Sequence, residues 1–407
     1  MECLLYCPVY GYYEKEEDTP GRRGDYFTSA SVGSLFGDLL ALQFSEWLTQ
    51  NDAASLQDPP HTLKTAPDGL PLLGAPASRR RVSCPPGRET PTPPRSLKIV
   101  EAGAHTGALA KDILTWLSTQ RPDLCESVEY CIIEPSARRQ LWQRRTLNAF
   151  LSQVRWFGSL SELMTVGRDG GIVPNQRPIR GIMFSNELFD AMPVHRVAWD
   201  AQQSLWFEWG VAFCNGHFQW TRLREDQSEV PLCVILPQAN LQFQASSSET
   251  CGLANRFLKN LPDGFILEIC PAANQWWAQA AGMLESGKLL TIDYGFSENE
   301  LLSPERLEGT LRAYHRHHLT SDVLANPGEQ DITAHVNFSS LRRIGEAAGL
   351  KTEAFVSQEQ FLTRIASRIF EQHTPFSDWT PEKTRQFQTL THPNHLGHAF
   401  RVLVQSR

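Results

Sequence analysis

An acid, two glycines and a histidine follow an apolar run at a spacing that could form a ligand-binding loop. The stretch reads E-x-G-x-H-x-G, with Glu101, Gly103, His105 and Gly107 directly after the letters KIV. A phosphate-binding P-loop would end in Lys followed by Ser or Thr, which this stretch lacks. A dinucleotide loop would have its second glycine at His105 and its third at Ala108. The spacing therefore favours a ligand that places no phosphate over the turn.

The same spacing resembles the E/D-x-G-x-G-x-G loop of adenosylmethionine-dependent methyltransferases, with His105 as the one substitution. That cofactor has no phosphate, and the N-terminus of the helix after the loop can hold its carboxylate. Histidine is tolerable here because it adopts positive φ more readily than most residues. The alternative is a strand-to-helix turn that binds no ligand.

Two further positions follow the ends of later strands. Glu134 ends the second predicted strand, where a carboxylate can accept hydrogen bonds from both hydroxyls of a ribose. Its alternative is a surface carboxylate that caps the next helix, since Pro135 suits a first helical turn. Ser159 follows the third predicted strand, and we expect it to lie beside the adenine ring.

A polar cluster follows the fourth predicted strand, in the stretch FSNELFDAMPVHRV. Asn186, Glu187 and Asp190 stand at its carboxyl end, the edge of the sheet where α/β enzymes bind ligands, with Asn186 expected beside the cofactor. If the turn is helical, Glu187 and Asp190 share a face. Two such carboxylates could orient a planar cation such as a guanidinium. The alternative is an N-cap and first-turn acids on a solvated helix.

A parallel sheet would bring these residues to one edge. Strand and helix patterns alternate along the chain, which is typical of an α/β fold with helices covering a parallel sheet. The predicted strands are at 97–102, 128–134, 154–158, 179–187, 287–295 and 399–405. The predicted helices of this core are at 107–119, 136–150, 271–286 and 338–349.

Composition divides the chain into three parts. Residues 1–50 carry apolar side chains at helical spacing from Leu35 to Leu48, which predicts an N-terminal helical segment. Residues 51–96 are rich in proline and lack periodicity, which predicts a disordered insertion. Residues 97–407 hold the alternating pattern and form the third part.

Two segments interrupt the alternation of the third part. Residues 194–243 alternate as strands do around the turn at 214–217, which predicts inserted hairpins. Residues 309–338 are polar and irregular, and we interpret them as a lid on the substrate side. Within the lid, Asp331 and His335 could form a base loop, although Asp331 could equally cap the turn before it.

Composition also excludes several classes of partner. The net charge of −7 gives no general attraction to nucleic acid. No apolar run approaches the ~20 residues that a membrane span requires. The nine cysteines are odd in number and scattered, as in a reducing compartment. We expect either a bacterial cytoplasmic protein or a mitochondrial matrix protein with a trimmed N-terminus, and the residues give no signal for an oligomeric state.

Two groups of histidines could bind zinc by their number. His392, His395 and His398 follow an H-x-x-H-x-x-H spacing, and the other group lies at 315–318. Pro393 interrupts the first group and favours a turn over a helix. We therefore predict no metal site.

Several longer motifs together resemble one known family. In chain order they are GDYFTSASVGSLFGDLLA, VEAGAHTG, SNELFDAMPVHRV, LEICPAA, LLTIDYG, GTLRAYHRHHL and NPGEQDITAHVNF. They resemble the bacterial and mitochondrial methyltransferase family that includes the complex I assembly-factor protein arginine methyltransferase. It is also called the mitochondrial dysfunction protein A family. The resemblance covers nearly the whole chain except 51–96.

The resemblance implies a fold, a cofactor and a reaction. It implies a seven-stranded, Rossmann-like methyltransferase domain, S-adenosylmethionine as cofactor, and methyl transfer to an arginine of a protein such as a respiratory complex I subunit. Glu101, Gly103 and Gly107 would form the cofactor loop, and Glu134 would bind the ribose. Glu187 would occupy the place where other arginine methyltransferases keep a guanidinium-binding glutamate.

Within this interpretation we expect Glu187 and Asp190 to be the catalytic pair. Asp293, Asp331 and His335 are the expected contacts of the substrate. Two other functions use the same fold. One is a non-catalytic assembly or scaffold protein, and the other is a methyltransferase with a small-molecule acceptor.

Overall fold

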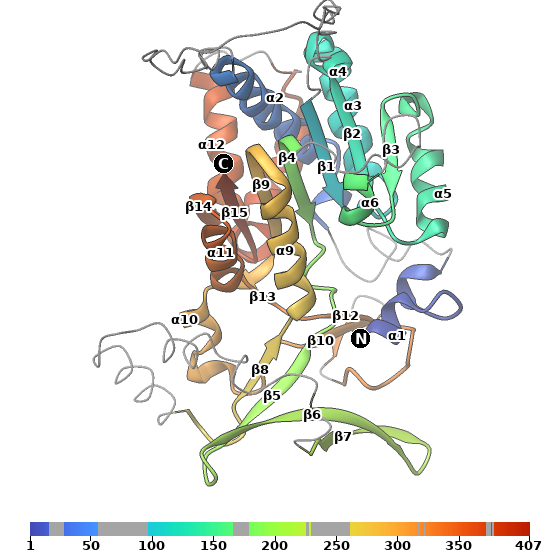
Figure 1. Ribbon diagram of the computed structural model, residues 1–407, viewed down its shortest axis with the longest axis vertical. Coiled ribbons are helices and arrows are strands. Elements are labelled where there is room, and N and C mark those ends of the chain that lie inside the picture. Colours follow the sequence, from blue (N-terminus) through green and yellow to red (C-terminus); the bar gives the residue numbers. More distant parts are fainter. Residues whose placement is uncertain are drawn as a thin grey trace, which may run out of the picture.

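A central sheet organises the molecule. The computed structural model describes residues 1–15, 28–55, 97–165, 179–224, 228, 261–315, 318–320, 322–371, 376 and 378–407. The strands of the central sheet are β1 (Leu97–Ala102), β2 (Val128–Ile133), β3 (Val154–Phe157), β4 (Ile179–Asn186), β9 (Leu284–Phe296), β13 (Val336–Asn337), β14 (Lys351–Ser357) and β15 (Phe400–Ser406). Their order is β14-β15-β9-β4-β1-β2-β3, and β13 pairs with β9 in addition (Figure 1). The predicted α/β, Rossmann-like class is confirmed.

Strand direction places the candidate residues at one edge. β1, β2, β3, β4 and β9 run parallel, whereas β15 is antiparallel to β9 and to β14. The chain proceeds from β1 to β2 on one side and returns to β4 on the other. The carboxyl ends of β1 and β4 therefore flank the point where the strand order reverses, which is where open α/β sheets bind their ligands.

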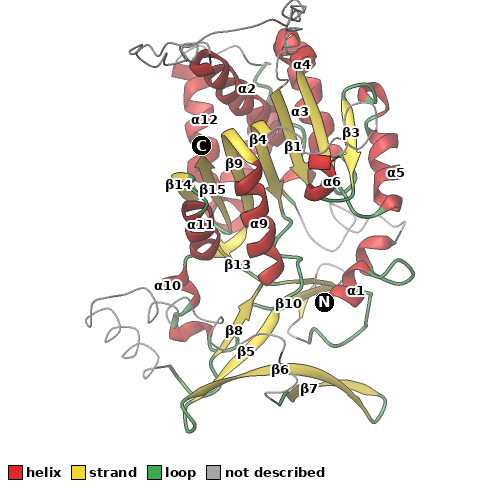
Figure 2. Cartoon of the chain, viewed as in Figure 1, coloured by secondary structure: helices red, strands yellow, loops and turns green. Residues whose placement is uncertain are grey.

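Helices cover both faces of the sheet, as Figure 2 shows. One layer holds α2 (Leu35–Ser55), α3 (Ala108–Gln120), α12 (Gln358–Glu371) and α13 (Pro381–Thr391). The other holds α6 (Leu160–Thr165), α9 (Pro271–Met283) and α11 (Phe338–Ala347). Ile99 packs into the first layer and Val100 into the second. This two-sided burial explains why the strands are apolar at nearly every position.

Two smaller sheets lie beyond the carboxyl edge (Figure 1). The four-stranded sheet has the order β7-β6-β5-β8, from β5 (His195–Asp200), β6 (Leu205–Cys214), β7 (His217–Arg222) and β8 (Ile266–Ile269). Cys214 pairs with His217 across the β6–β7 turn, as predicted. The predicted hairpin residues 229–243 lie outside the described residues.

The prediction that 309–338 is irregular was wrong. β10 (Arg312–His315), β11 (His318–Thr320) and β12 (Asp331–Thr333) form a three-stranded sheet. Strands of three or four residues are too short for apolar alternation to reveal them. The remaining α-helices among the described residues are α1 (Glu2–Tyr6), α4 (Pro122–Ser127), α5 (Ala137–Thr146) and α10 (Glu298–Leu301).

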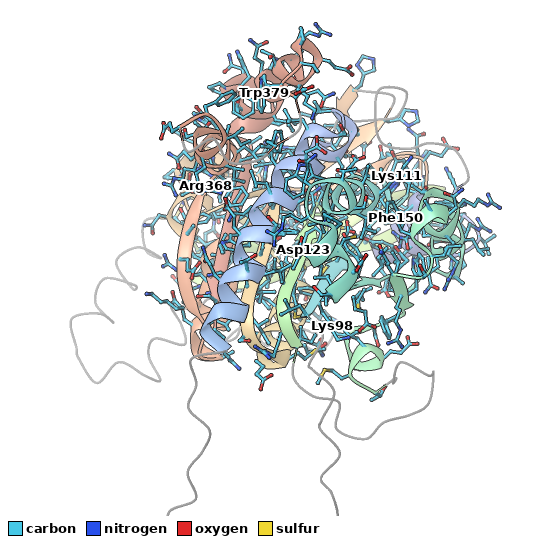
Figure 3. The ribbon with its side chains drawn as sticks, turned by 90° about the horizontal axis from the view of Figure 1, so that it is seen from above. Lys98, Lys111, Asp123, Phe150, Arg368 and Trp379 are labelled. Atoms are coloured by element: carbon cyan, nitrogen blue, oxygen red, sulfur yellow. The ribbon has the colours of Figure 1, made fainter. Side chains whose placement is uncertain are left out.

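Helix α2 extends five residues past the predicted end of the N-terminal segment, to Ser55. Residues 56–96 of the predicted insertion lie outside the described residues. Figure 3 shows α2 from above, with Arg368 of α12 on one flank and Lys111 of α3 on the other. Arg368 forms an ion pair with Glu46 of α2 at 3.0 Å. None of the described helices is both long and apolar enough to span a bilayer.

Candidate functional site

The glycine loop joins β1 to α3 through three residues with left-handed backbones. The φ angles are +74° at Gly103, +46° at His105 and +83° at Gly107. His105 therefore adopts the positive φ that the sequence predicted for it, and Gly107 is the N-cap of α3. A Cβ on Gly103 would lie 2.8 Å from Leu188 Cδ1, so the loop packs closely on the residues that follow β4.

Glu101 lies beneath the loop. Its Oε2 accepts a hydrogen bond of 2.7 Å from the hydroxyl of Tyr130 on β2, and the residue is buried. Burial raises the pKa of Glu101 to about 7, against the opposing effect of the Tyr130 hydrogen bond. The described contacts of Glu101 thus join β1 to β2 and fix the strand from which the loop begins.

Glu134 is 1% exposed and lies next to the glycine loop. It accepts hydrogen bonds from the Ser136 backbone N–H at 3.0 Å and from Gln143 Nε2 at 3.1 Å, and Arg139 approaches it at 3.2 Å. Gln143 Nε2 also donates to the carbonyl oxygen of His105 at 3.0 Å. Burial raises the pKa of Glu134, while Arg139 lowers it. Gln143 therefore ties the predicted ribose-binding acid to the predicted cofactor loop.

Ser159 lies after β3, at the start of α6. Its Oγ accepts a hydrogen bond of 3.1 Å from the backbone N–H of Glu162. This contact is that of a helix N-cap. The predicted contact with adenine stays a prediction.

The segment after β4 is a turn without helical structure, so the prediction of a possible helix there was wrong. Glu187 has a φ of +52°, a value that helical residues do not adopt. The Asp293 carboxylate accepts hydrogen bonds from the backbone N–H groups of Leu188 (3.2 Å) and Phe189 (2.9 Å). The shape of the turn is therefore set by an acid on β9 that is distant in sequence.

One oxygen of the Glu187 carboxylate accepts two hydrogen bonds, and the other oxygen is open, with no partner among the described residues. Its Oε1 accepts hydrogen bonds from the backbone N–H of Ser29 at 3.1 Å and from Asn186 Nδ2 at 2.9 Å. Its Oε2 and the Oδ1 of Asn186 are buried and have no hydrogen-bond partner among the described residues. Although Glu187 as a residue is partly exposed, this oxygen atom is not. These two neighbouring acceptors can therefore each accept a hydrogen bond from an N–H group of a ligand.

Four acids gather around this turn. Asp190, Asp293 and Asp331 are 4%, 0% and 0% exposed. Burial, followed by the charges of its acidic neighbours Asp293, Glu187 and Asp331, raises the pKa of Asp190 well above its ordinary value. Burial raises the pKa of Asp293 to about 7, although backbone N–H groups oppose the shift. Burial raises the pKa of Glu187 to about 8. Such a cluster favours a cationic ligand, which would relieve the repulsion.

The N-terminal residues cover the acidic cluster, and sequence reasoning missed them. Tyr13 donates its hydroxyl hydrogen to Asp331 Oδ1 at 2.6 Å, and Tyr6 donates to the carbonyl oxygen of Ala191 at 3.0 Å. Glu14 accepts a hydrogen bond of 2.8 Å from the Ser136 hydroxyl. The aromatic run at 6–13 was visible in the sequence, but no local pattern indicates contacts with residues more than 100 positions away.

His335 lies apart from the carboxylates. Its ring packs against Phe296 at a tilt of 48°, with centroids 4.7 Å apart. Burial, followed by the charges of Arg312 and Arg306, lowers the pKa of His335 to about 4. Among the described residues, no three His, Cys, Asp or Glu side chains come together as a metal site would require.

The residues at the β1–β4 switch point suit a cofactor that carries an ammonium, a carboxylate and a ribose. The open oxygen of Asn186 suits an N–H donor, and the loop turns into the N-terminus of α3, which suits a carboxylate. Glu134 offers a buried carboxylate next to this loop.

A family model described as "putative S-adenosyl-L-methionine-dependent methyltransferase" matches residues 87–356. This span exceeds half of the chain and contains both the glycine loop and the acidic turn. The chain belongs to this family. The protein is accordingly a methyltransferase, and its cofactor is S-adenosylmethionine.

Solved and curated relatives of this methyltransferase extend along most of the chain. A candidate methyl transfer enzyme from Burkholderia thailandensis, crystallised with S-adenosyl-homocysteine, is 26% identical with a TM-score of 0.69 over 100% of this chain and 86% of its own. "Protein arginine methyltransferase NDUFAF7, mitochondrial" of Xenopus tropicalis is 26% identical over 91% of this chain and 71% of its own length. The Homo sapiens protein of that name is 23% identical over 98% and 77%.

Proposed function

We propose that this methyltransferase transfers the methyl group to the guanidinium of an arginine in a protein acceptor. The observation that carries the proposal is the open Oε2 of Glu187, buried among three further acids at the carboxyl end of β4. A guanidinium is planar, always charged and rich in donors, so it matches adjacent carboxylate oxygens. The names of the curated relatives support the same acceptor.

In this proposal Glu187 and Asp190 bind the acceptor. When bound, S-adenosylmethionine supplies an already activated methyl group, so the protein acts mainly by positioning. Glu187 would hold the guanidinium through Oε2 while Ser29 and Asn186 fix its other oxygen. Because its carboxyl group has a pKa of about 8, Glu187 would release a proton when the cation binds near neutral pH.

We assign different roles to the other two acids of the cluster. Asp293 accepts hydrogen bonds from Leu188 and Phe189, so we propose that it positions the turn rather than contacting the acceptor as the sequence suggested. Asp331, held by Tyr13, adds to the negative field that attracts a cation.

The cofactor would lie over the glycine loop. We propose that Gly103, His105 and Gly107 provide its backbone surface and that Glu134 accepts hydrogen bonds from the ribose. Asn186 and Ser159 would complete the contacts at the ends of β4 and β3. Glu101 would support the loop from below through Tyr130.

We extend the proposal to the partner, the location and the organisation of the chain. A respiratory complex I subunit is the proposed protein acceptor, and the mitochondrial matrix the proposed location, because the relatives named above are mitochondrial. Residues 309–338 would act as the substrate lid, since Asp331 and His335 lie on the acceptor side. We also retain the division into an N-terminal helical segment, an insertion and a methyltransferase domain.

The acceptor can be identified by transfer of a labelled methyl group. The protein is incubated with cell lysate and S-adenosylmethionine labelled in the methyl group, and labelled proteins are hydrolysed to amino acids. We expect label in methylated arginine, and no such label when the protein is replaced by its Glu187→Gln variant. Label confined to a small metabolite, or to another amino acid, would refute the proposal.

A further inference from the structure

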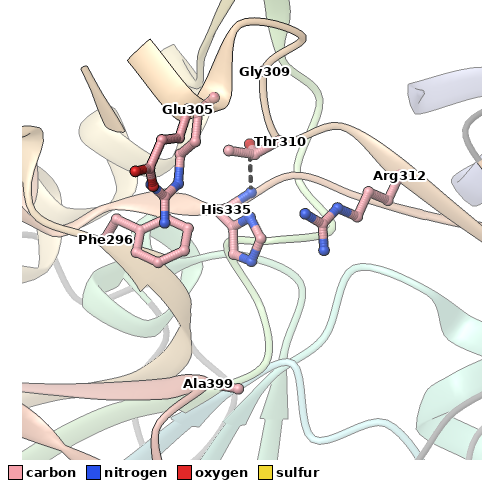
Figure 4. A pocket seen from close by; sticks show the side chains of 8 residues that line it. Phe296, Glu305, Gly309, Thr310, Arg312, His335 and Ala399 are labelled. Carbon is pink, nitrogen blue, oxygen red and sulfur yellow. Dashed lines mark hydrogen bonds between the residues drawn. The ribbon is translucent and has the colours of Figure 1, made fainter. Parts of the chain in front are cut away.

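A second site lies beside the acidic cluster and has the opposite charge. It is a cavity of about 360 Å³ lined by Phe296, Glu305, Arg306, Gly309, Thr310, Arg312, His335 and Ala399. Cavities of this size hold a side chain or small ligand. Figure 4 shows the ring of His335 between Phe296 and Arg312.

The two arginines of this pocket have donors for a ligand, and Arg312 also hydrogen-bonds to the side chain of Tyr314. Neither Arg306 nor Arg312 forms an ion pair with a described residue. Arg306 instead stacks its guanidinium over the Phe296 ring, with 4.1 Å between Cζ and the ring centroid. A planar guanidinium fixed in this way keeps its N–H donors for an anion.

His335 adds a buried polar atom without a partner. Its Nδ1 is buried and has no hydrogen-bond partner among the described residues. Because burial, together with the charges of Arg312 and Arg306, lowers its pKa to about 4, the imidazole is neutral near pH 7 and can still donate one hydrogen bond. Buried polar atoms are normally paired, so this one points to a missing ligand.

Hydrogen bonds of Thr310 hold the wall of the pocket in place. Thr310 Oγ1 accepts the backbone N–H of His335 at 3.1 Å and donates to Glu268 Oε2 at 2.9 Å. The Thr310 backbone N–H also donates to Glu268 Oε2, at 2.7 Å. Gly309 has a φ of +76°, and a Cβ there would collide with Glu268. Only glycine therefore allows the loop to close on this acid.

The carboxylates near the pocket do not neutralise the charge of its two arginines. Glu268 is engaged by Thr310 and approached by Arg196 at 3.8 Å. Glu300 pairs with Arg401 at 2.9 Å. Glu305 is the one carboxylate among the lining residues, and it is exposed on a 3-10 turn. Two guanidiniums therefore face one exposed acid.

The pocket adjoins the acceptor side of the active site. Phe296 ends β9, three residues after Asp293, and His335 follows the strand that begins at Asp331. Next to His335, the Ala334 backbone N–H donates to the Asp190 carbonyl oxygen at 2.8 Å. A protein acceptor that places an arginine among the acids would bring its neighbouring residues to this pocket.

We infer that the pocket binds a carboxylate of the acceptor protein, held by Arg306, Arg312 and His335 while the acceptor's arginine lies in the acidic cluster. This inference rests on the proposed function. The carboxylate can belong to an Asp or Glu side chain near the arginine or to the end of the acceptor chain. Opposite charges in adjoining sites would fix the direction in which the acceptor binds.

Binding can be tested without methyl transfer. The full-length protein is labelled with 15N-histidine, the His335 signal is assigned with the His335→Gln variant, and three probes are added. N-acetylglutamate methylamide carries a side-chain carboxylate, N-acetylglycine a terminal one, and N-acetylglutamine methylamide none. We expect a saturable shift of the His335 signal with one or both carboxylates and none with the amide.

Two variants test whether Arg306 and Arg312 bind the carboxylate. Arg306→Gln/Arg312→Gln should weaken carboxylate binding about tenfold, because charge-assisted hydrogen bonds are lost. Arg342→Gln removes one guanidinium from the exposed face of α11 and should change nothing. Equal shifts with the amide and the carboxylates, or no saturable shift with any probe, would overturn the inference.

Methylation of peptide pools separates this inference from the proposed function. Peptides with one arginine are offered with labelled S-adenosylmethionine, with either Glu or Gln at the positions around it. We expect the Glu pool to be preferred by the wild type, and the preference to vanish in the double arginine variant. Equal methylation of both pools would refute the pocket's role and leave the proposed function intact. Carboxylate binding without methylation of any arginine would refute the proposed function alone.

Discussion

The two halves of the active site that we propose are assembled in different ways. The cofactor half comprises residues 101–107 and Glu134, and its contacts join the loop after β1 to strand β2 and to the next helix, α5. The acceptor half comprises Glu187, Asp190, Asp293 and Asp331, which come from three distant segments and are covered by a fourth, the N-terminus. The residues of the cofactor half can be recognised from their spacing in the sequence, whereas those of the acceptor half come together only when the chain folds.

The halves also differ in charge. Glu134 has Arg139 beside it, which compensates its buried charge. Glu187, Asp190 and Asp293 of the acceptor half form no ion pair with a described Lys or Arg. Buried carboxylates without such a partner cost stability, and binding a cation offsets that cost. We propose that a cationic substrate supplies the charge that these three acids lack.

The largest effect is expected from Glu187→Gln. The variant keeps the shape of the side chain but removes the charge-assisted contact with a guanidinium, so methyl transfer should fall by about 100-fold or more. Initial rates with labelled S-adenosylmethionine measure it. Glu346→Gln, at an exposed glutamate of α11, is the matched control. A Glu187→Gln rate within threefold of the control's would remove Glu187 from the site.

A somewhat smaller effect is expected from Glu134→Gln on the cofactor half. Loss of a carboxylate that accepts from the ribose should weaken S-adenosylmethionine binding by on the order of 10- to 100-fold. Calorimetry measures the affinity, with exposed Glu126→Gln as control. Because Arg139 loses a partner in the variant, thermal unfolding must accompany the titration. Unchanged affinity in a folded variant would show that Glu134 only supports the loop.

The pH dependence should reveal the raised pKa of Glu187, which is about 8. Only the ionised carboxylate pairs with a guanidinium, so kcat/KM should rise about tenfold between pH 7 and 9. The rise should be absent in Glu187→Gln. A wild-type profile that is flat over this interval would contradict the assignment.

The same shift has a consequence for stability. A carboxyl group whose pKa is raised in the folded state contributes stability that is present below about pH 4.5 and is lost as the pH rises to about 8. The free energy of unfolding of the wild type should therefore fall across this interval more steeply than that of Glu187→Gln. Urea denaturation at pH 6 and pH 8 tests it. Parallel pH dependence in the two proteins would mean that this carboxyl group is not buried in solution.

The smallest effect is expected from His105→Gly. Glycine accepts the φ of +46° without strain, and the described hydrogen bond of His105 to Gln143 uses only its backbone oxygen. Cofactor affinity should change by no more than about threefold. A loss beyond tenfold in a calorimetric titration would show that the imidazole contacts the cofactor.

Much of the cofactor half could be predicted from sequence because its signals are local. The strand at 97–102 and the positive φ of His105 follow from apolar runs and loop spacing within a few residues. The short strands at 312–333 and the non-helical turn after β4 could not be predicted in this way. Their conformations depend on hydrogen bonds that backbone N–H groups donate to Asp293 and on pairing between distant segments. For the same reason the sequence did not reveal the roles of Tyr13 and Ser29. Their hydrogen bonds to Asp331 and Glu187 span 318 and 158 residues of the sequence.

The division into two halves is tested most directly by titrating S-adenosylmethionine into Glu187→Gln in a calorimeter, beside Glu134→Gln. We expect Glu187→Gln to bind the cofactor with the affinity of the wild type although it no longer transfers the methyl group, and Glu134→Gln to bind it weakly. Loss of cofactor affinity in Glu187→Gln, in parallel with its activity, would contradict the account.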